Sequence, residues 1–178
     1  MASPRRAGSS KLFNKPALPL PRLGLLLLCV AWLLPGLIGH APWKGGDGEH
    51  FVQLWQLLKN GAAPQAVSAM PLYYWVATAT AWLTSAFLPL ADGARLASGL
   101  FIALALFFVA RAARALYGEE SAWAAALTLL GCMGLLVRGH ELNAATAQFA
   151  AAAIMLYGLA ALPQAPRSEG NYRIYGPE

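Results

Sequence analysis

Two groups of ionisable residues lie beside long apolar stretches of this sequence. The first group occupies a glycine-rich segment and consists of Lys44, Asp47, Glu49 and His50. The second group separates two apolar stretches and consists of Arg138, His140, Glu141 and Asn143. Ionisable groups next to membrane-like segments are costly, and they are therefore candidates for function.

The residue types in both groups suit the transfer of a chemical group away from a phosphate carrier. A carboxylate such as that of Asp47 or Glu49 can act as a general base on an acceptor hydroxyl or amine. An arginine such as Arg138 can hold a phosphate through charge-assisted hydrogen bonds. The spacing contains no metal-binding motif and no nucleotide-binding loop, so no cofactor is predicted and a need for a divalent metal stays open.

A purely structural interpretation of these residues is equally compatible with their spacing. Asp47 or Glu49 could cap the helix that follows or favour its positive N-terminus. Arg138 and His140 could be interfacial residues at a helix end. The aromatic residues near the first group favour an aromatic belt at the membrane surface over a sugar-binding platform. They are Trp43, Trp55, Tyr73, Tyr74 and Trp75.

Composition predicts an all-α, polytopic integral membrane protein. Of the 178 residues, 58% are hydrophobic and 12% are charged, whereas soluble domains carry roughly 25% charged residues. A bilayer span takes about 20 mainly apolar residues, and we expect about four or five hydrophobic helices. They cover about residues 23–39, 70–90, 95–113, 121–137 and 144–162. Cys29 and Cys132 both lie inside such segments, which supports neither a disulfide framework nor a metal site.

One further helix, short and amphipathic, is predicted over residues 50–59. Phe51, Leu54, Trp55 and Leu58 recur there at helical spacing. A helix with one apolar and one polar face is suited to lie on the membrane surface.

Charge distribution predicts the orientation in the membrane. The chain has 13 basic and 8 acidic residues, and its tail over 1–22 is basic and contains no acid. Such a tail favours a cytoplasmic N-terminus, although a cleaved signal peptide is an alternative. Arg111 and Arg114 are cytoplasmic if 70–90 stays at the outer side, and outside if 70–90 spans. We favour the first arrangement, which places Asp47 and the 138–143 segment on the same outer face. The charges form no basic face for nucleic acid.

Four short strings, in this order, resemble the membrane glycosyltransferases of the GT-C class. They are Gly39–Lys44 with the acids Asp47 and Glu49 behind it, Pro71–Trp75, Ala94–Ser98 and Arg138–Asn143. The similarity covers about residues 23–162 and is greatest to bacterial lipid A aminoarabinose transferases and protein O-mannosyltransferases. One departure is Ser68-Ala-Met-Pro71, where the family often has Glu-Lys-Pro-Pro.

The resemblance implies a bacterial inner-membrane enzyme that acts at the outer face. Its donor would be a sugar on a polyprenyl phosphate, its acceptor a lipid or a protein, and transfer would invert the anomeric carbon. Asp47 or Glu49 would be the general base. The remaining site residues would bind the donor phosphate or orient the acceptor. They are Lys44, Arg95, Arg138, His140 and Glu141.

The length of the chain predicts that it contains only part of such an enzyme. We expect a cytoplasmic tail over 1–22, an N-terminal transmembrane module over 23–162 and a polar C-terminal tail over 163–178. Members of the resembled family are much longer, so the chain is expected to be a truncated or partial copy. The alternative function is a non-catalytic membrane subunit or scaffold that binds a lipid-linked sugar.

Overall fold

The computed structural model describes residues 22–39, 42, 45–61, 67 and 69–162, and this part of the chain is all-α, as predicted. Its helices are α1 (Arg22–Leu33), α2 (Gly45–Asn60), α4 (Pro71–Leu83), α5 (Leu90–Tyr117), α6 (Ser121–Leu130), α7 (Met133–Arg138) and α8 (Ala145–Ala161). The predicted site residue Lys44 and the tails over 1–21 and 163–178 lie outside the described residues.

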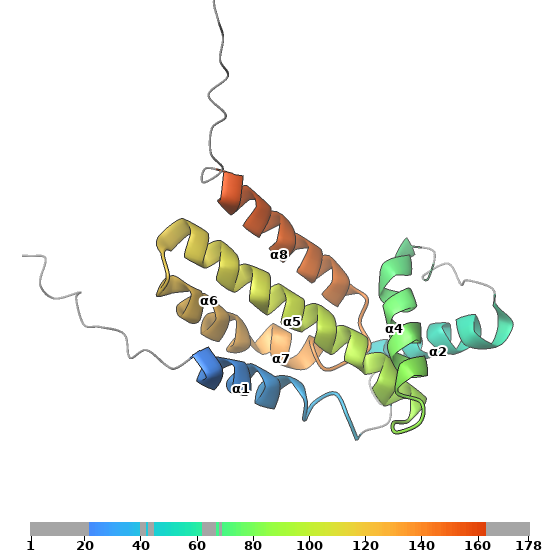
Figure 1. The fold of residues 1–178 in the computed structure, drawn as a ribbon. Coiled ribbons are helices and arrows are strands. Elements are labelled where there is room, and N and C mark those ends of the chain that lie inside the picture. Colours follow the sequence, from blue (N-terminus) through green and yellow to red (C-terminus); the bar gives the residue numbers. More distant parts are fainter. Residues whose placement is uncertain (1–21, 40–41, 43–44, 62–66, 68, 163–178) are drawn as a thin grey trace, which may run out of the picture.

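Helix α5 is the centre of the fold (Figure 1). It packs against α8, α4 and α6, while α1 contacts both α5 and α6. The core shared by α5 and α8 is built largely from alanines, among them Ala97, Ala105, Ala150 and Ala153. Small side chains let two helix backbones approach closely, which explains the extended contact between these helices.

Two glycines of α5 make room for neighbouring segments. A Cβ on Gly93 would lie 2.4 Å from Thr84 Oγ1 and 3.0 Å from the Cα of Ala81. A Cβ on Gly99 would lie 2.4 Å from a methyl group of Leu37. Helix α4 and the turn after α1 can therefore pack closely on α5 only because Gly93 and Gly99 have no side chain.

The charged residues of α5 are confined to its two ends. Asp92 and Arg95 lie in its first turns, Arg111 and Arg114 lie in its last turns, and residues 96–110 carry no charge. Arg95 and Arg111 are 16 positions apart, which is about 24 Å along a helix. Figure 1 shows α2 and α4 at the start of α5, whereas α1 begins and α8 ends towards the other end.

Several predicted boundaries were wrong. The segment 121–137 is interrupted at Cys132, whose backbone is extended, because Gly131 lowers helix propensity there. The segment 23–39 is helical only to Leu33, since Pro35 cannot continue the hydrogen-bond pattern. Helix α4 likewise stops at Leu83, short of residue 90.

The glycine-rich segment around Asp47 is helical, although the sequence predicted a helix over residues 50–59 only. It forms the first turns of α2, which begins at Gly45 and not at residue 50. Asp47 lies in the first turn, where a carboxylate favours the positive helix N-terminus. Among the described helices, α5 alone is long and apolar enough to cross a membrane, and the apolar helices α6 and α8 are shorter.

Candidate functional site

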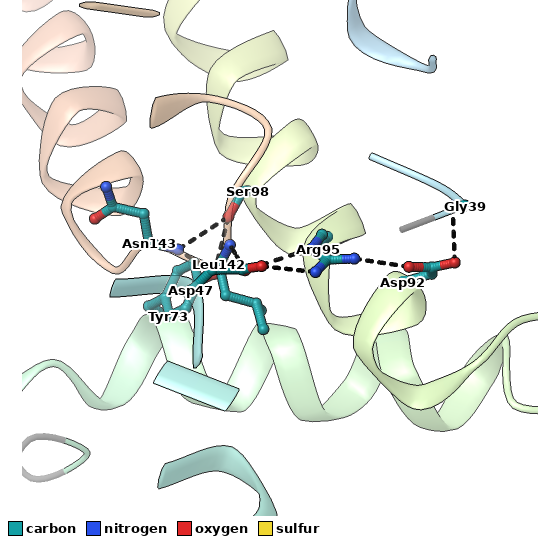
Figure 2. A network of polar contacts seen from close by, with 8 residues as sticks. All are labelled: Gly39, Asp47, Tyr73, Asp92, Arg95, Ser98, Leu142 and Asn143. Atoms are coloured by element: carbon teal, nitrogen blue, oxygen red, sulfur yellow. Dashed lines mark hydrogen bonds and ion pairs between the residues drawn. The ribbon is translucent and has the colours of Figure 1, made fainter. Parts of the chain in front are cut away.

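The candidate site is centred on Arg95, whose side chain is completely buried between two aspartates. Its Nη2 lies 2.7 Å from Asp47 Oδ2 in α2, and its Nη1 lies 2.7 Å from Asp92 Oδ1 one turn earlier in α5. Figure 2 shows the guanidinium with one carboxylate on either side. Because a buried charge is tolerated only when it is paired, Arg95 and the two acids depend on each other.

The two carboxylates also hold backbone segments from elsewhere in the chain. Asp47 Oδ1 accepts a hydrogen bond of 2.8 Å from the Leu142 amide, and Asp92 Oδ2 accepts one of 3.0 Å from the Gly39 amide. Both oxygens of each aspartate are therefore engaged (Figure 2). The acids tie the turn after α1 and the segment before α8 to the start of α5.

A second set of hydrogen bonds fixes the start of α8. The Tyr73 hydroxyl lies 2.8 Å from Ser98 Oγ and accepts a bond of 2.9 Å from the Asn143 amide. Asn143 Oδ1 in turn accepts the Ala145 amide at 3.0 Å. Burial raises the pKa of Tyr73 well above its ordinary value, so its hydroxyl keeps its proton.

Beside this network, His50 forms a hydrogen-bonded group with Tyr74 and Gln53. The Tyr74 hydroxyl donates to Gln53 Oε1, and His50 Nδ1 lies 2.6 Å from the same hydroxyl oxygen. Since the only proton of Tyr74 is used, the hydrogen between the two residues must be on Nδ1 of His50. Burial lowers the pKa of His50, and the negative charges of Glu49 and Asp47 partly oppose that shift.

The two predicted groups of ionisable residues meet at one point. The backbone of Leu142, next to Glu141, contacts Asp47, and Glu141 is itself buried. His140 instead donates from Nε2 to the Trp32 carbonyl at 3.0 Å, and its ring packs on the Trp32 ring. Asp47 is thus adjacent to the 138–143 segment, but Asp47 and His140 both make contacts that hold the fold together.

Among the described site residues that the sequence predicted, Glu49 and Arg138 alone are exposed. Arg138 contributes to the wall of a cavity of about 480 Å³ between α5, α7 and α8. This wall is mainly apolar, with Ile102, Leu129, Leu135 and Phe149, and it includes the polar residues Asn143 and Thr146. Neither Asp47 nor Glu49 lines this cavity, so this particular cavity contains residues of the second predicted group only.

Three residues of the network were not predicted as site residues from the sequence. Asp92 lies three positions before Arg95, a spacing that places both on one helix face and could have revealed the pair. Ser98 carries no signal of its own. Tyr73, with Tyr74, was interpreted as part of an aromatic belt, but both side chains are buried, whereas Trp75 is exposed.

The described residues contain no group of three or more His, Cys, Asp or Glu side chains that could hold a metal ion. Comparisons with protein-family models, with curated proteins and with solved structures each give no significant match.

Proposed function

We propose that this chain is a membrane protein in which α5 crosses the bilayer. Its 28 residues measure about 42 Å, and its charges lie only at the ends. Large apolar side chains elsewhere are widely exposed, including Leu72, Trp82, Phe87 and Met155. Such an extended apolar surface is unfavourable in water and suits contact with lipid.

We further propose that the protein binds a polyprenyl-phosphate sugar at the outer face of the bacterial inner membrane. The observation that carries this proposal is the mainly apolar cavity of about 480 Å³ with Arg138 in its wall. Apolar walls suit an isoprenoid chain, and a guanidinium suits its phosphate. Asn143 and Thr146 supply hydrogen-bonding groups in the same cavity.

Sugar transfer from this donor is the activity that the resemblance to GT-C glycosyltransferases favours. The acceptor oxygen or nitrogen would attack the anomeric carbon, and its proton would pass to a carboxylate. The bond from the sugar to the phosphate oxygen would break, which releases polyprenyl phosphate. Glu49 is the better base of the predicted pair, because its side chain is exposed while both oxygens of Asp47 are engaged.

A non-catalytic membrane subunit that binds the same lipid is the second candidate. The use of Asp47 and Arg95 in one buried ion pair favours it, since each then satisfies the other and not a substrate. The two candidates share the lipid site and differ only in turnover.

The test is donor binding and turnover by the full chain in lipid nanodiscs. We expect the protein to bind a labelled polyprenyl-phosphate sugar. Unlabelled polyprenyl phosphate should compete with this binding, whereas polyprenol should not. Arg138→Gln should weaken binding at least tenfold, whereas Lys59→Gln, which removes an exposed cation of α2, should not. Absence of phosphate-dependent binding in the unaltered protein would reject both candidates.

Turnover then separates the enzyme from the subunit. The same protein in inner-membrane vesicles, which supply natural acceptors, should release polyprenyl phosphate from the labelled donor. Release above that of vesicles without the protein supports the transferase. Tight binding without release supports the subunit.

A further inference from the structure

The last turns of α5 carry a second basic site, which the proposed sugar transfer does not use. We infer that Arg111 and Arg114 bind the phosphate group of an anionic phospholipid at the membrane face opposite Arg95. This inference depends on α5 crossing the bilayer but not on any binding of a lipid-linked sugar.

Arg111 is held in position by aromatic side chains. Its Nη2 donates a hydrogen bond of 3.0 Å to the Tyr157 hydroxyl of α8. Its guanidinium carbon lies 5.3 Å from the centre of the Tyr157 ring and 5.7 Å from that of Phe107. A guanidinium has five N–H donors in a planar fork, so one bond to Tyr157 leaves most of them for an anion.

Arg111 and Arg114 line two cavities at this end of the molecule. The larger cavity, of about 530 Å³, is also bounded by Glu119, Tyr157 and Gly118. The smaller, of about 270 Å³, shares Arg111, Arg114 and Glu119. A volume of this order can hold the head of a phospholipid, and both cavities present the same two guanidinium groups.

Among the described residues, the charge that lines the larger cavity is incompletely balanced. Arg114 pairs with Glu119, both exposed, whereas no described carboxylate forms an ion pair with Arg111. The lining of the larger cavity therefore has a net charge of +1 from Arg111, Arg114 and Glu119. The adjacent Glu120 is exposed and does not line either cavity. A bound phosphate would complete the charge balance.

The position of Arg111 along α5 fits the level of a lipid headgroup. Arg111 lies about 24 Å along α5 from Arg95, so the two sites are separated by most of a hydrocarbon core of about 30 Å. Leu116, Tyr117 and Leu159 project large exposed apolar or aromatic surfaces near it. Basic pockets between membrane helices bind anionic headgroups, and each basic residue near the surface contributes about 1 kcal/mol, or about fivefold in affinity. A phospholipid is thus favoured over a free phosphate ester.

Lipid retention by the full chain tests the inference. We expect native mass spectrometry in detergent to show adducts of phosphatidylglycerol in preference to phosphatidylcholine. Arg111→Gln should lower phosphatidylglycerol retention about fivefold, and Arg111→Gln with Arg114→Gln about 25-fold. Lys59→Gln, which removes the cation stacked on Trp55, should leave it unchanged.

Two additional measurements distinguish a lipid site from a folding defect and from a site for a soluble phosphate ester. Arg111→Lys retains the charge and should retain more lipid than Arg111→Gln, even if the glutamine variant folds poorly. Glycerol phosphate, which is soluble in water, should compete only weakly with the lipid. Equal retention of both lipids, or no loss in the double variant, would overturn the inference. Equal binding of glycerol phosphate and lipid would replace the phospholipid with a soluble phosphate ester. Binding of the polyprenyl-phosphate donor, measured through Arg138, stays independent of all these outcomes.

Discussion

The guanidinium of Arg95 and the carboxylate of Asp47 lie 2.7 Å apart in a site where their side chains are 0% and 1% exposed. This ion pair joins α2 to the start of α5 across 48 positions of the sequence. Asp92 supplies a second carboxylate on the other side of the guanidinium. The guanidinium and its two described carboxylate partners have formal charges that sum to −1. Of these three charged groups, removing the arginine leaves two negative charges, whereas removing either aspartate leaves one neutral ion pair.

The first prediction compares Arg95→Gln with Asp47→Asn. Arg95→Gln removes the cation that lies between the two carboxylates, and breaking a buried pair typically costs about 3–5 kcal/mol. Asp47→Asn keeps Asp92 as the partner of Arg95 and can still accept the Leu142 amide, so we expect a loss of about 1.5–3 kcal/mol. Thermal and denaturant unfolding in detergent measure both losses.

Glu49→Gln is the matched control for this comparison, because Glu49 is an exposed acid two residues from Asp47. Its unfolding free energy should change by less than about 0.5 kcal/mol. A smaller loss for Arg95→Gln than for Asp47→Asn would contradict the described charge balance.

The second prediction concerns pH and His50. Burial holds the folded-state pKa of His50 below its ordinary value of about 6.5. Between these two pKa values the unfolded chain binds more protons, so stability rises with pH. The contribution of His50 is complete above about pH 6.5 and is lost as the pH falls through the folded-state pKa.

His50→Gln isolates this contribution, because glutamine can still donate to the Tyr74 hydroxyl but does not titrate. The melting temperature of the unaltered protein should fall more between pH 7.5 and about 5 than that of His50→Gln. Parallel curves for the two proteins would show that His50 titrates normally in the folded state.

The helical class and the long apolar segments could be predicted from composition and hydropathy alone. The breaks within those segments were harder, because Gly131 and Pro35 act through local backbone chemistry that an uncharged run conceals. Helix α2 likewise extends through Gly45 and Gly46, residues that ordinarily indicate a loop.

The network at Arg95 could be predicted only in part. The residues Asp47 and Arg95 were both identified as candidates, but their mutual pairing depends on the packing of α2 against α4 and α5, which no sequence spacing encodes. The same is true of the amide of Leu142, because a backbone donor has no residue-type signal. Side-chain types indicate which groups are costly to bury, whereas tertiary packing decides what neutralises them.

The third prediction concerns Gly36, in the turn after α1. A Cβ at this position would lie 2.2 Å from Cδ2 of the His140 ring. Gly36→Ala should therefore displace His140 from the Trp32 carbonyl and cost about 1–3 kcal/mol of stability. Gly158→Ala, in α8, meets no atom within 4 Å and should be neutral or slightly stabilising. Equal melting temperatures for the two alanine variants would contradict this packing.

The fourth prediction follows from the proposal that α5 crosses the bilayer. In a background of Cys29→Ala and Cys132→Ala, single cysteines at Gln56 and Glu120 should react from opposite faces with an impermeant thiol reagent. Both positions are exposed, one on α2 and one after α5. Glu120→Cys should react only when the cytoplasmic face is accessible. Labelling of both positions from one face would reject the proposed topology.

The last prediction separates a general base from a positioning residue. If Glu49 takes the acceptor proton, Glu49→Gln should lower donor turnover by about 10²–10⁴-fold, the usual contribution of such a base. Donor binding should remain, because the proton moves only in the transition state. Asp47→Asn should instead lose turnover together with folded protein, since Asp47 holds Arg95 and Leu142 in place. At a temperature where Asp47→Asn is still fully folded, it should retain most of its turnover. Loss of turnover by this variant, with donor binding intact, would assign the base to Asp47 and would require its release from Arg95 during catalysis. Full turnover by Glu49→Gln would exclude Glu49 as the base.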